Sequence, residues 1–420
     1  MQKNNYRVTK FACYAINLSM AAVITLSPLL FTTFRSLYSV SYTLLGTLVL
    51  INFISQLTID LIFSFFSKRF NIALTVRIMP VINLIGMLIY ALLPKFFPEY
   101  AYLCLVVGTV IFSISAGLSE VLISPLVAAM PSENPDREMS KLHSVYAWSV
   151  VAVALVSAAF IKLFGAENWH YMVLLWATVP LVCTVLFLKS PIPDVNRDSK
   201  PRGSGEKMNK GLIALFVLCI FFGSASENTM TNWSSGYVES ALGLSKTLSD
   251  ILGMAMFALA LGIGRTLYGK IGKNIMPVLM FGFVGALICY LTAGLSKLPV
   301  FGLLSCILTG FCTAMLWPGT LIMAENKYND CGVFVYAMLA AGGDFGASVA
   351  PQLLGIVTDA VSTGAFAAEL GAKYGLSPEQ IGLHSGMLLT ALFPLMGVIV
   401  MLLINRKLKA DPNDKQSMLK

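Results

Sequence analysis

The chain has 420 residues, of which 57% are hydrophobic and only 12% are charged. An ordinary soluble domain is about 45–50% apolar and about 25% charged, so this composition excludes most soluble classes of protein. Apolar stretches longer than about 18 residues recur along the chain, and that length suffices to cross a hydrocarbon core about 30 Å thick. The composition therefore predicts an all-α membrane protein.

The formal net charge is +8, which raises the question of a nucleic-acid partner. The basic residues are confined to short segments between apolar stretches and form no stripe interleaved with aromatic residues, so we expect no nucleic-acid binding. The eight cysteines include no CxxC pair, and the three histidines are scattered, so we expect no metal site and no cofactor. The sequence contains neither a phosphate-binding GxxxxGK[ST] motif nor a nucleophile–base set, which excludes ATP-driven pumping and argues against an enzyme.

Twelve apolar stretches follow one another along the chain, and each predicts a membrane-spanning helix. Their approximate ranges are 11–34, 41–67, 71–95, 100–129, 139–164, 169–189, 211–236, 246–270, 274–295, 298–325, 332–359 and 382–405.

A polar stretch between the sixth and seventh helices divides the chain into two predicted halves. We expect an N-terminal six-helix bundle at 1–190, a cytoplasmic linker at 191–210, and a C-terminal six-helix bundle with a short cytoplasmic tail at 211–420. Two similar halves around a central site are a recurring plan among secondary transporters. Segment 361–381 is expected outside the membrane, where Ser377 and Pro378 resemble the start of a capped helix.

The basic residues are distributed unevenly between the two sides of the membrane. Of the 29 Lys and Arg residues, six lie in the odd-numbered junctions and 22 lie at the termini, in the even-numbered junctions or at the adjoining helix ends; Arg77 is left inside a helix. Because positive residues concentrate in cytoplasmic loops, this pattern predicts that both termini face the cytoplasm.

Glu120 is a carboxylate inside the fourth predicted helix. Ser113, Gly117, Glu120 and Ser124 follow helical spacing and share one face, while Pro125 frees a carbonyl nearby. A charged residue at membrane depth costs about 2.5–3.5 kcal/mol, so its presence asks for a reason. Proton carrying is the functional interpretation, and a permanently protonated or paired structural Glu is the alternative.

The outer half of the seventh predicted helix is polar on every side. Glu227, Asn228, Asn232 and Trp233 lie in this stretch. Backbone and side chains of this polarity are tolerated at depth where they line a cavity. Amides beside an aromatic ring suit a polyhydroxylated ligand, whereas the alternative is hydrogen bonding between helices.

Asp344 lies in the eleventh predicted helix among glycines, where close packing and a transport role are both open. Asp250 and Asp359 fall near the outer boundary, and we assign them no role. We expect Glu120, Asp344 and Glu227 to be the residues that carry protons.

Two further pairs of charges lie toward the inner ends of their helices. Asp60 and Arg77, on the second and third helices, are expected to form an ion pair. Arg265 and Glu325, on the eighth and tenth helices, are similarly placed. Such pairs can hold a cytoplasmic gate shut and open it when they break.

Taken together, these residues resemble the major facilitator superfamily, and within it the fucose-permease-like branch. The most specific match is the segment Ala116–Pro131, where a Glu is followed by a small residue and Pro; the polar seventh helix with Trp233 is also similar. The resemblance implies a role for Glu120 in proton coupling and sugar recognition. Helix 11–34 lacks the acid that this branch carries there, and the basic turn after the second helix reads Ser67-Lys68-Arg69-Phe70-Asn71.

The first hypothesis for function is proton-coupled uptake of a sugar or similar small polar solute by alternating access, in a monomer of a bacterial inner membrane. A drug/proton antiporter on the same fold is the second, and a non-transporting membrane sensor is the third. The candidate substrate-binding residues are Asn17, His143, Tyr146, Trp148, Asn228, Asn232, Trp233 and Trp317.

Overall fold

The computed structural model describes residues 6–66, 69–132, 135–193, 209–271, 274–296, 298–328 and 332–410, and every regular element in these ranges is helical. The helices of the first half of the chain are α1 (Arg7–Leu29), α2 (Phe31–Tyr38), α3 (Tyr42–Phe66), α4 (Ile72–Phe96), α5 (Ala101–Ala128), α6 (Pro135–Phe164) and α7 (Trp169–Lys189), with short 3₁₀ turns at Pro98–Tyr100 and Ala166–Asn168.

The second half begins with α8 (Lys210–Ser240). It continues with α9 (Lys246–Ser249), the π-helix η4 (Asp250–Ala255), α10 (Met256–Ile271), α11 (Ile275–Leu295), α12 (Pro299–Thr313), α13 (Leu316–Tyr328), α14 (Gly332–Ser362), α15 (Ala365–Tyr374), α16 (Pro378–Thr390) and α17 (Leu392–Ala410).

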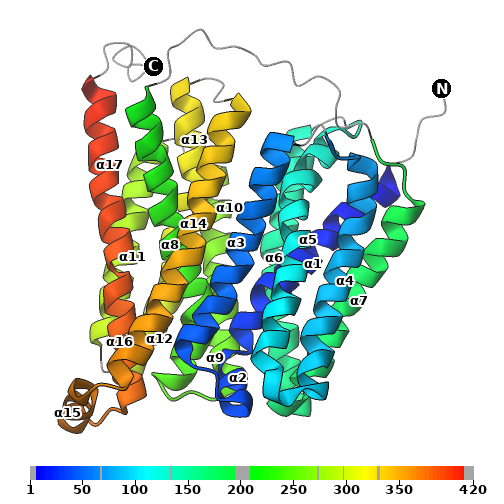
Figure 1. Ribbon diagram of the computed structural model, residues 1–420. Helices are drawn as coiled ribbons and strands as arrows, with labels where there is room; N and C mark the ends of the chain where they lie inside the picture. The colour runs from blue at the N-terminus through cyan, green and yellow to red at the C-terminus, as the bar shows by residue number, and fades with distance from the viewer. Residues whose placement is uncertain are drawn as a thin grey trace. The chain divides into compact units, whose positions relative to one another are not determined.

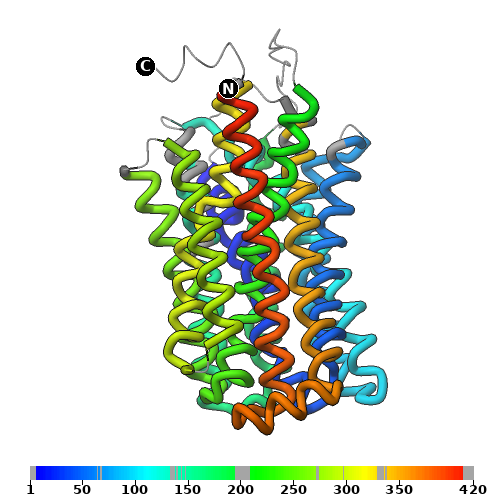
Figure 2. The backbone as a smooth tube through the Cα atoms, turned by 90° about the vertical axis from the view of Figure 1, so that its left-hand side faces the viewer, coloured from blue at the N-terminus to red at the C-terminus, as the bar shows by residue number. Residues whose placement is uncertain are grey.

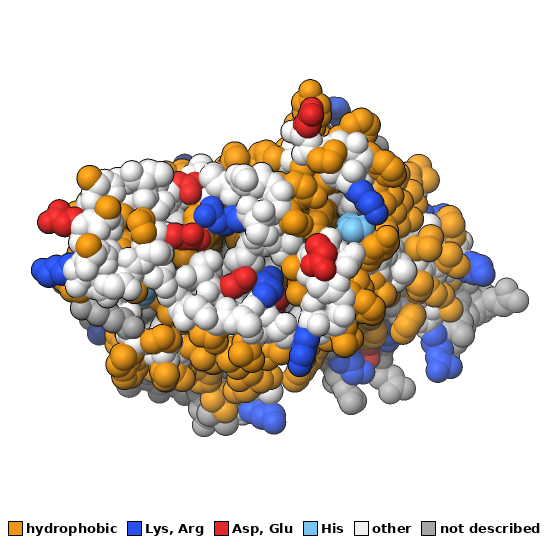
Figure 3. Space-filling view, turned by 90° about the horizontal axis from the view of Figure 1, so that it is seen from below, with side chains coloured by type: hydrophobic (Ala, Val, Ile, Leu, Met, Phe, Trp, Pro, Cys, Tyr) orange, Lys and Arg blue, Asp and Glu red, His pale blue; other side chains and the backbone are white. Residues whose placement is uncertain are grey.

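Within the described ranges, eleven helical segments are long and apolar enough to cross a membrane, or twelve if α14 and the sharply bent α15 are counted as one broken span. Hydrophobic side chains predominate around the edge of the face in Figure 3, as expected of helices that meet lipid. The protein is thus a multi-pass α-helical membrane protein. Which side of the membrane its termini face remains a prediction.

By its internal contacts the chain forms two compact units. Unit 1 comprises Met1–Ser199 with Asn232–Leu259, and unit 2 comprises Lys200–Thr231 with Ala260–Lys420. The predicted boundaries of the two six-helix halves stay a prediction, and most of the predicted linker lies outside the described residues.

Unit 1 is organised around α5. This helix packs against both α3 and α4, while α1 packs against α6 and α7 (Figure 1). Buried apolar side chains fill the space between these helices, among them Ile16, Val76 and Leu118. The face of α5 that carries Glu120 therefore lies among packed helices.

Unit 2 is organised around α11, which packs against α12, α16 and α17 (Figure 2). Its buried core includes Phe216, Leu279 and Phe283. Helix α16 begins as the sequence predicts: Ser377 Oγ accepts from the backbone N–H of Gln380, and the Gln380 side chain accepts from the N–H of Ser377. Such reciprocal capping satisfies two donors that a helix start otherwise leaves without partners.

Candidate functional site

Helices α3 and α5 pack closely at Gly117. A Cβ at this position would lie 3.0 Å from the Gln56 carbonyl oxygen and 3.0 Å from the Ile59 Cβ. A side chain at this position would require the neighbouring atoms of α3 to shift. The predicted polar face of α5 is thereby pressed against a face of α3.

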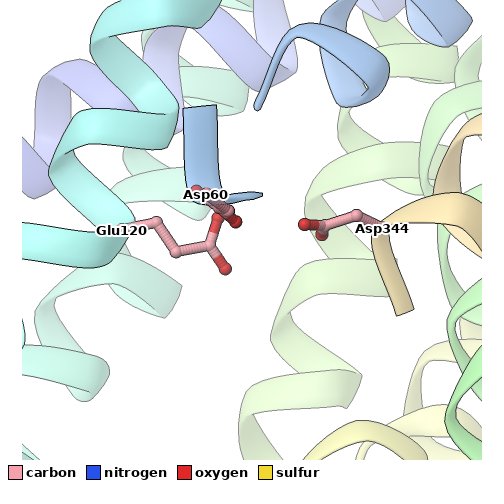
Figure 4. A group of neighbouring side chains, drawn as sticks. All are labelled: Asp60, Glu120 and Asp344. Carbon is pink, nitrogen blue, oxygen red and sulfur yellow. The ribbon is translucent and has the colours of Figure 1, made fainter. Parts of the chain in front are cut away.

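Two carboxylates meet along this contact. Asp60 of α3 and Glu120 of α5 have carboxylate oxygens within 4.8 Å of each other, and their side chains point toward one another in Figure 4. Asp60 is buried and Glu120 is partly exposed. Two carboxylates this close cannot both be charged cheaply, so the pair favours holding one proton.

Neutral polar side chains extend the contact along the two helices. Ser113 Oγ donates to Asn52 Oδ1 at 3.1 Å, and Gln56 Nε2 donates to the same oxygen. Asn52, Gln56 and Asp60 are four residues apart in turn, so they share one face of α3. We call these three, together with Ser113 and Glu120 of α5, the polar seam. Asn52 and Gln56 were not predicted from the sequence, although their four-residue spacing from Asp60 places all three on one helix face.

A groove of about 590 Å³ lies between α1 and α6, within unit 1. Its lining residues are Tyr14, Leu18, Lys141, Ser144, Val145, Trp148, Ser149 and Ala152. Trp148, a predicted ligand residue, is 64% exposed. Two other substrate-binding residues predicted on these helices do not line the groove. Asn17 donates to the Leu142 carbonyl at 3.1 Å and so joins α1 to α6, and Tyr146 is not among the lining residues. The side chain of His143 lies outside the described residues.

One end of the groove carries a cluster of charges. Glu138 accepts from Lys10 at 3.0 Å, from Lys141 at 3.1 Å and from the Tyr14 hydroxyl at 3.1 Å. Hydrogen bonds from Lys10 and then Lys141 lower the pKa of Glu138 to about 2. Glu138 is therefore ionised at every pH at which the protein would work.

A second polar cluster of unit 1 includes the end of α8. Asp250, wholly buried at the start of η4, accepts from Lys246 at 2.6 Å and from Ser235. Glu239 lies 3.7 Å from Lys246 and accepts from Thr32 of α2 at 2.7 Å. The sequence analysis assigned Asp250 no role, although the spacing of Lys246 and Asp250 was a signal of an ion pair on one helix face.

Trp233 occupies a packed position beside this cluster. The ring is fully buried, with its centroid 5.0 Å from that of Phe31 and 5.7 Å from that of Tyr42. Asn232 is buried as well. The C-terminal end of α8 thus packs against α2 and α3, and Trp233 contributes packing area there.

In unit 2, Glu227 of α8 forms an ion pair with Arg265 of α10, 3.2 Å apart. The Arg265 Nε donates to the Ala314 carbonyl at 3.0 Å, in the break between α12 and α13. Pro318 lacks an N–H, which leaves the carbonyl four residues earlier without its helical donor, and Arg265 supplies one instead. Arg265 was expected to lie with Glu325, but it contacts Glu227, and Glu325 is exposed.

Three further residues of unit 2 were predicted to belong to the site: Asn228, Trp317 and Asp344. Asn228 donates to the backbone carbonyl and hydroxyl of Ser224, one turn earlier in α8. The Trp317 ring lies against Gly343, where an added Cβ would be 2.1 Å from the ring. Asp344, next to this glycine on α14, is 4% exposed. The close approaches of α14 thus explain the glycines around Asp344.

The predicted ion pair of Asp60 and Arg77 stays a prediction. Helix α5 lies against both α3 and α4, and it brings Glu120 next to Asp60. Asp60 therefore belongs to the same site as Glu120, whereas the sequence analysis had assigned it to a gate.

The chain matches the Major Facilitator Superfamily over residues 12–351. This range is most of the chain, so the protein belongs to the Major Facilitator Superfamily. Membership agrees with the helical architecture and identifies the protein as a membrane transporter and not an enzyme. No curated protein sequence matches the chain significantly.

Solved structures share this fold at low sequence identity. A D-xylose-proton symporter is 15% identical, with a TM-score of 0.73, and the match covers 93% of this chain and 97% of that one. A bacterial homologue of the human lysosomal transporter Spinster, inward-facing and occupied, is 15% identical with a TM-score of 0.70, covering 95% and 96%. The nucleoside transporter NupG is 14% identical with a TM-score of 0.64, covering 94% and 98%. At these identities the likeness concerns the fold alone.

Proposed function

We propose that the protein uses a proton gradient to take up a small polar solute, such as a sugar, by alternating access. The observation that carries the proposal is the pair of carboxylates in the polar seam, within 4.8 Å of each other on two membrane-spanning helices. Binding or release of one proton at the pair changes the charge of the site by one unit. A proton gradient can therefore shift the equilibrium between conformations that bind this proton with different affinity.

Other observations support the same function. The resemblance of Ala116–Pro131 to the fucose-permease branch falls on the helix that carries Glu120. One of the similar structures is a proton symporter for a sugar. The distribution of basic residues favours cytoplasmic termini, and we propose a bacterial inner membrane as the location and a monomer as the working state.

The deciding experiment measures solute movement in proteoliposomes with the Glu120→Gln variant. We expect proton-driven accumulation to fall by about 100-fold, because the variant cannot exchange the proton, while exchange of labelled for unlabelled solute continues. Ser124→Ala, on the same face of α5, is the matched control and is expected to accumulate solute normally. Full accumulation by Glu120→Gln would contradict the proposal.

A drug/proton antiporter would use the same carboxylates with transport in the opposite direction. An outwardly directed solute flux driven by proton entry, with cationic dyes as solutes and no sugar uptake, would favour that alternative. The substrate itself is first sought by thermal-shift screening of the purified protein against sugars, sugar acids, nucleosides and amino acids.

A further inference from the structure

The groove between α1 and α6 combines an apolar wall with polar ends at a defined spacing. Lys141 and Trp148 lie seven residues apart on α6, which separates them by about 10 Å along the helix axis. Between them lie Ser144 and Val145, on the same face of the helix. The volume of about 590 Å³ is in the range of small-molecule sites.

Among the described side chains at the Lys141 end of the groove, positive charge exceeds negative charge. Two ammonium groups, of Lys10 and Lys141, share the single carboxylate of Glu138, whose two oxygens already accept three hydrogen bonds. The three side chains together carry one excess positive charge. Each lysine has three donors, so both retain N–H groups for another acceptor.

Trp148 provides the opposite kind of surface. Its side chain is 64% exposed although it lines the groove, and an aromatic face of this size binds the CH face of a sugar or another ring by dispersion and burial. Asn17 donates to the Leu142 carbonyl at 3.1 Å and so joins the two helices that line the groove. The groove therefore presents a cationic end and an aromatic platform on one rigid pair of helices.

We propose that this groove binds a small solute that bears one acidic group, with the acid at Lys141 and a ring against Trp148. The inference rests on the proposed transport function and narrows its substrate class from polar solutes in general to organic anions such as sugar acids. A cation would meet the excess positive charge, and a neutral sugar would leave the free ammonium donors without an ionic partner.

The test compares glucose with two derivatives that keep its pyranose ring and differ in charge: anionic glucuronate and cationic glucosamine. Binding to the purified full-length protein is measured by titration calorimetry at low salt. We expect glucuronate to bind at least tenfold more tightly than glucose, with glucosamine weakest. Lys141→Gln should remove the preference for glucuronate, Lys141→Arg should retain it, and Lys162→Gln, an exposed position on the same helix, should change nothing.

The platform is tested separately. Trp148→Ala should weaken the binding of glucose and glucuronate by a similar factor, and Trp148→Phe should restore most of it. Equal affinity for the three sugars, a preference for glucosamine, or no saturable binding of glucuronate would overturn the inference.

Failure of this inference can be told apart from failure of the proposed function. Proton-driven uptake of a neutral sugar that is unaffected by Lys141→Gln would overturn the anion assignment and leave proton coupling intact. Groove binding of glucuronate without any proton-driven uptake by the unaltered protein would retain the site and overturn the coupling.

Discussion

The two units solve the problem of charge in a membrane in opposite ways. In unit 1, Asp60 and Glu120 bring two groups of the same sign within 4.8 Å. In unit 2, Glu227 lies against Arg265, and Arg265 also bonds the Ala314 carbonyl. Two like charges gain by taking up a proton, whereas a carboxylate and a guanidinium neutralise each other already.

This difference predicts which site changes charge during transport. We expect the polar seam to gain and lose a proton. Glu227 was predicted to carry a proton as well, but its ion pair with Arg265 favours a role in packing or gating instead. Removal of one charged partner should therefore destabilise the folded state in unit 2 and should not destabilise it in unit 1. Three substitutions test this contrast.

The largest effect is expected from Arg265→Gln. This change leaves Glu227 charged without its guanidinium and the Ala314 carbonyl without its donor, so the folded state should lose about 3–5 kcal/mol. Thermal unfolding in detergent measures the loss. The double variant Arg265→Gln with Glu227→Gln should recover most of it, because no unpaired charge remains; a double variant as unstable as the single one would count against the ion pair as the cause.

An intermediate effect is expected from Gly117→Leu, because even a Cβ at this position would lie 3.0 Å from atoms of Gln56 and Ile59 on α3. Separation of the two helices should reduce stability by about 1–3 kcal/mol and weaken proton-driven accumulation by moving Asp60 from Glu120. Gly262→Leu, at a glycine with no neighbour within 4 Å of an added Cβ, is the control. Normal coupling in Gly117→Leu would show that the closeness of the carboxylates is unimportant.

The smallest effect on stability is expected from Asp60→Asn. Removal of one of two like charges relieves repulsion, so stability at neutral pH should stay the same or rise by up to about 1 kcal/mol. Proton coupling should nonetheless weaken, because Glu120 then has no second carboxylate with which to share a proton. A fall in stability as large as that of Arg265→Gln would indicate that Asp60 serves mainly as one half of an ion pair, and the contrast between the units would disappear.

Helix positions followed from hydrophobic length, because a span must cover the thickness of the membrane. Residues 169–189 were predicted and form α7, and 332–359 became α14 with three further residues. The interruptions did not follow from length. The range predicted at 298–325 divides into α12 and α13. The eighth span begins with α9 and continues through the π-helix η4. Apolar composition does not distinguish straight, broken and widened helices.

The candidate site was predictable on single helix faces and unpredictable between helices. The face of α5 that carries Glu120 followed from residue spacing. Its pairing with Asp60 did not, because the hydrophobicity of helices does not show which of them pack together. The sequence suggested an Asp60–Arg77 pair, whereas α5 lies against both α3 and α4. Arg265 was likewise expected with Glu325, and Glu227 lies there instead.

The lengths of α3 and α5 have an electrical consequence. Asp60 follows the first residue of α3 by 18 positions and Glu120 follows that of α5 by 19, which places both carboxylates about 27–29 Å along their helices. That distance is nearly the full thickness of a hydrocarbon core of about 30 Å. A proton that reaches the pair from the side where these helices begin would cross most of the membrane potential, worth about 2.3 kcal/mol per 100 mV. Voltage, and not only the pH difference, should then drive the transporter.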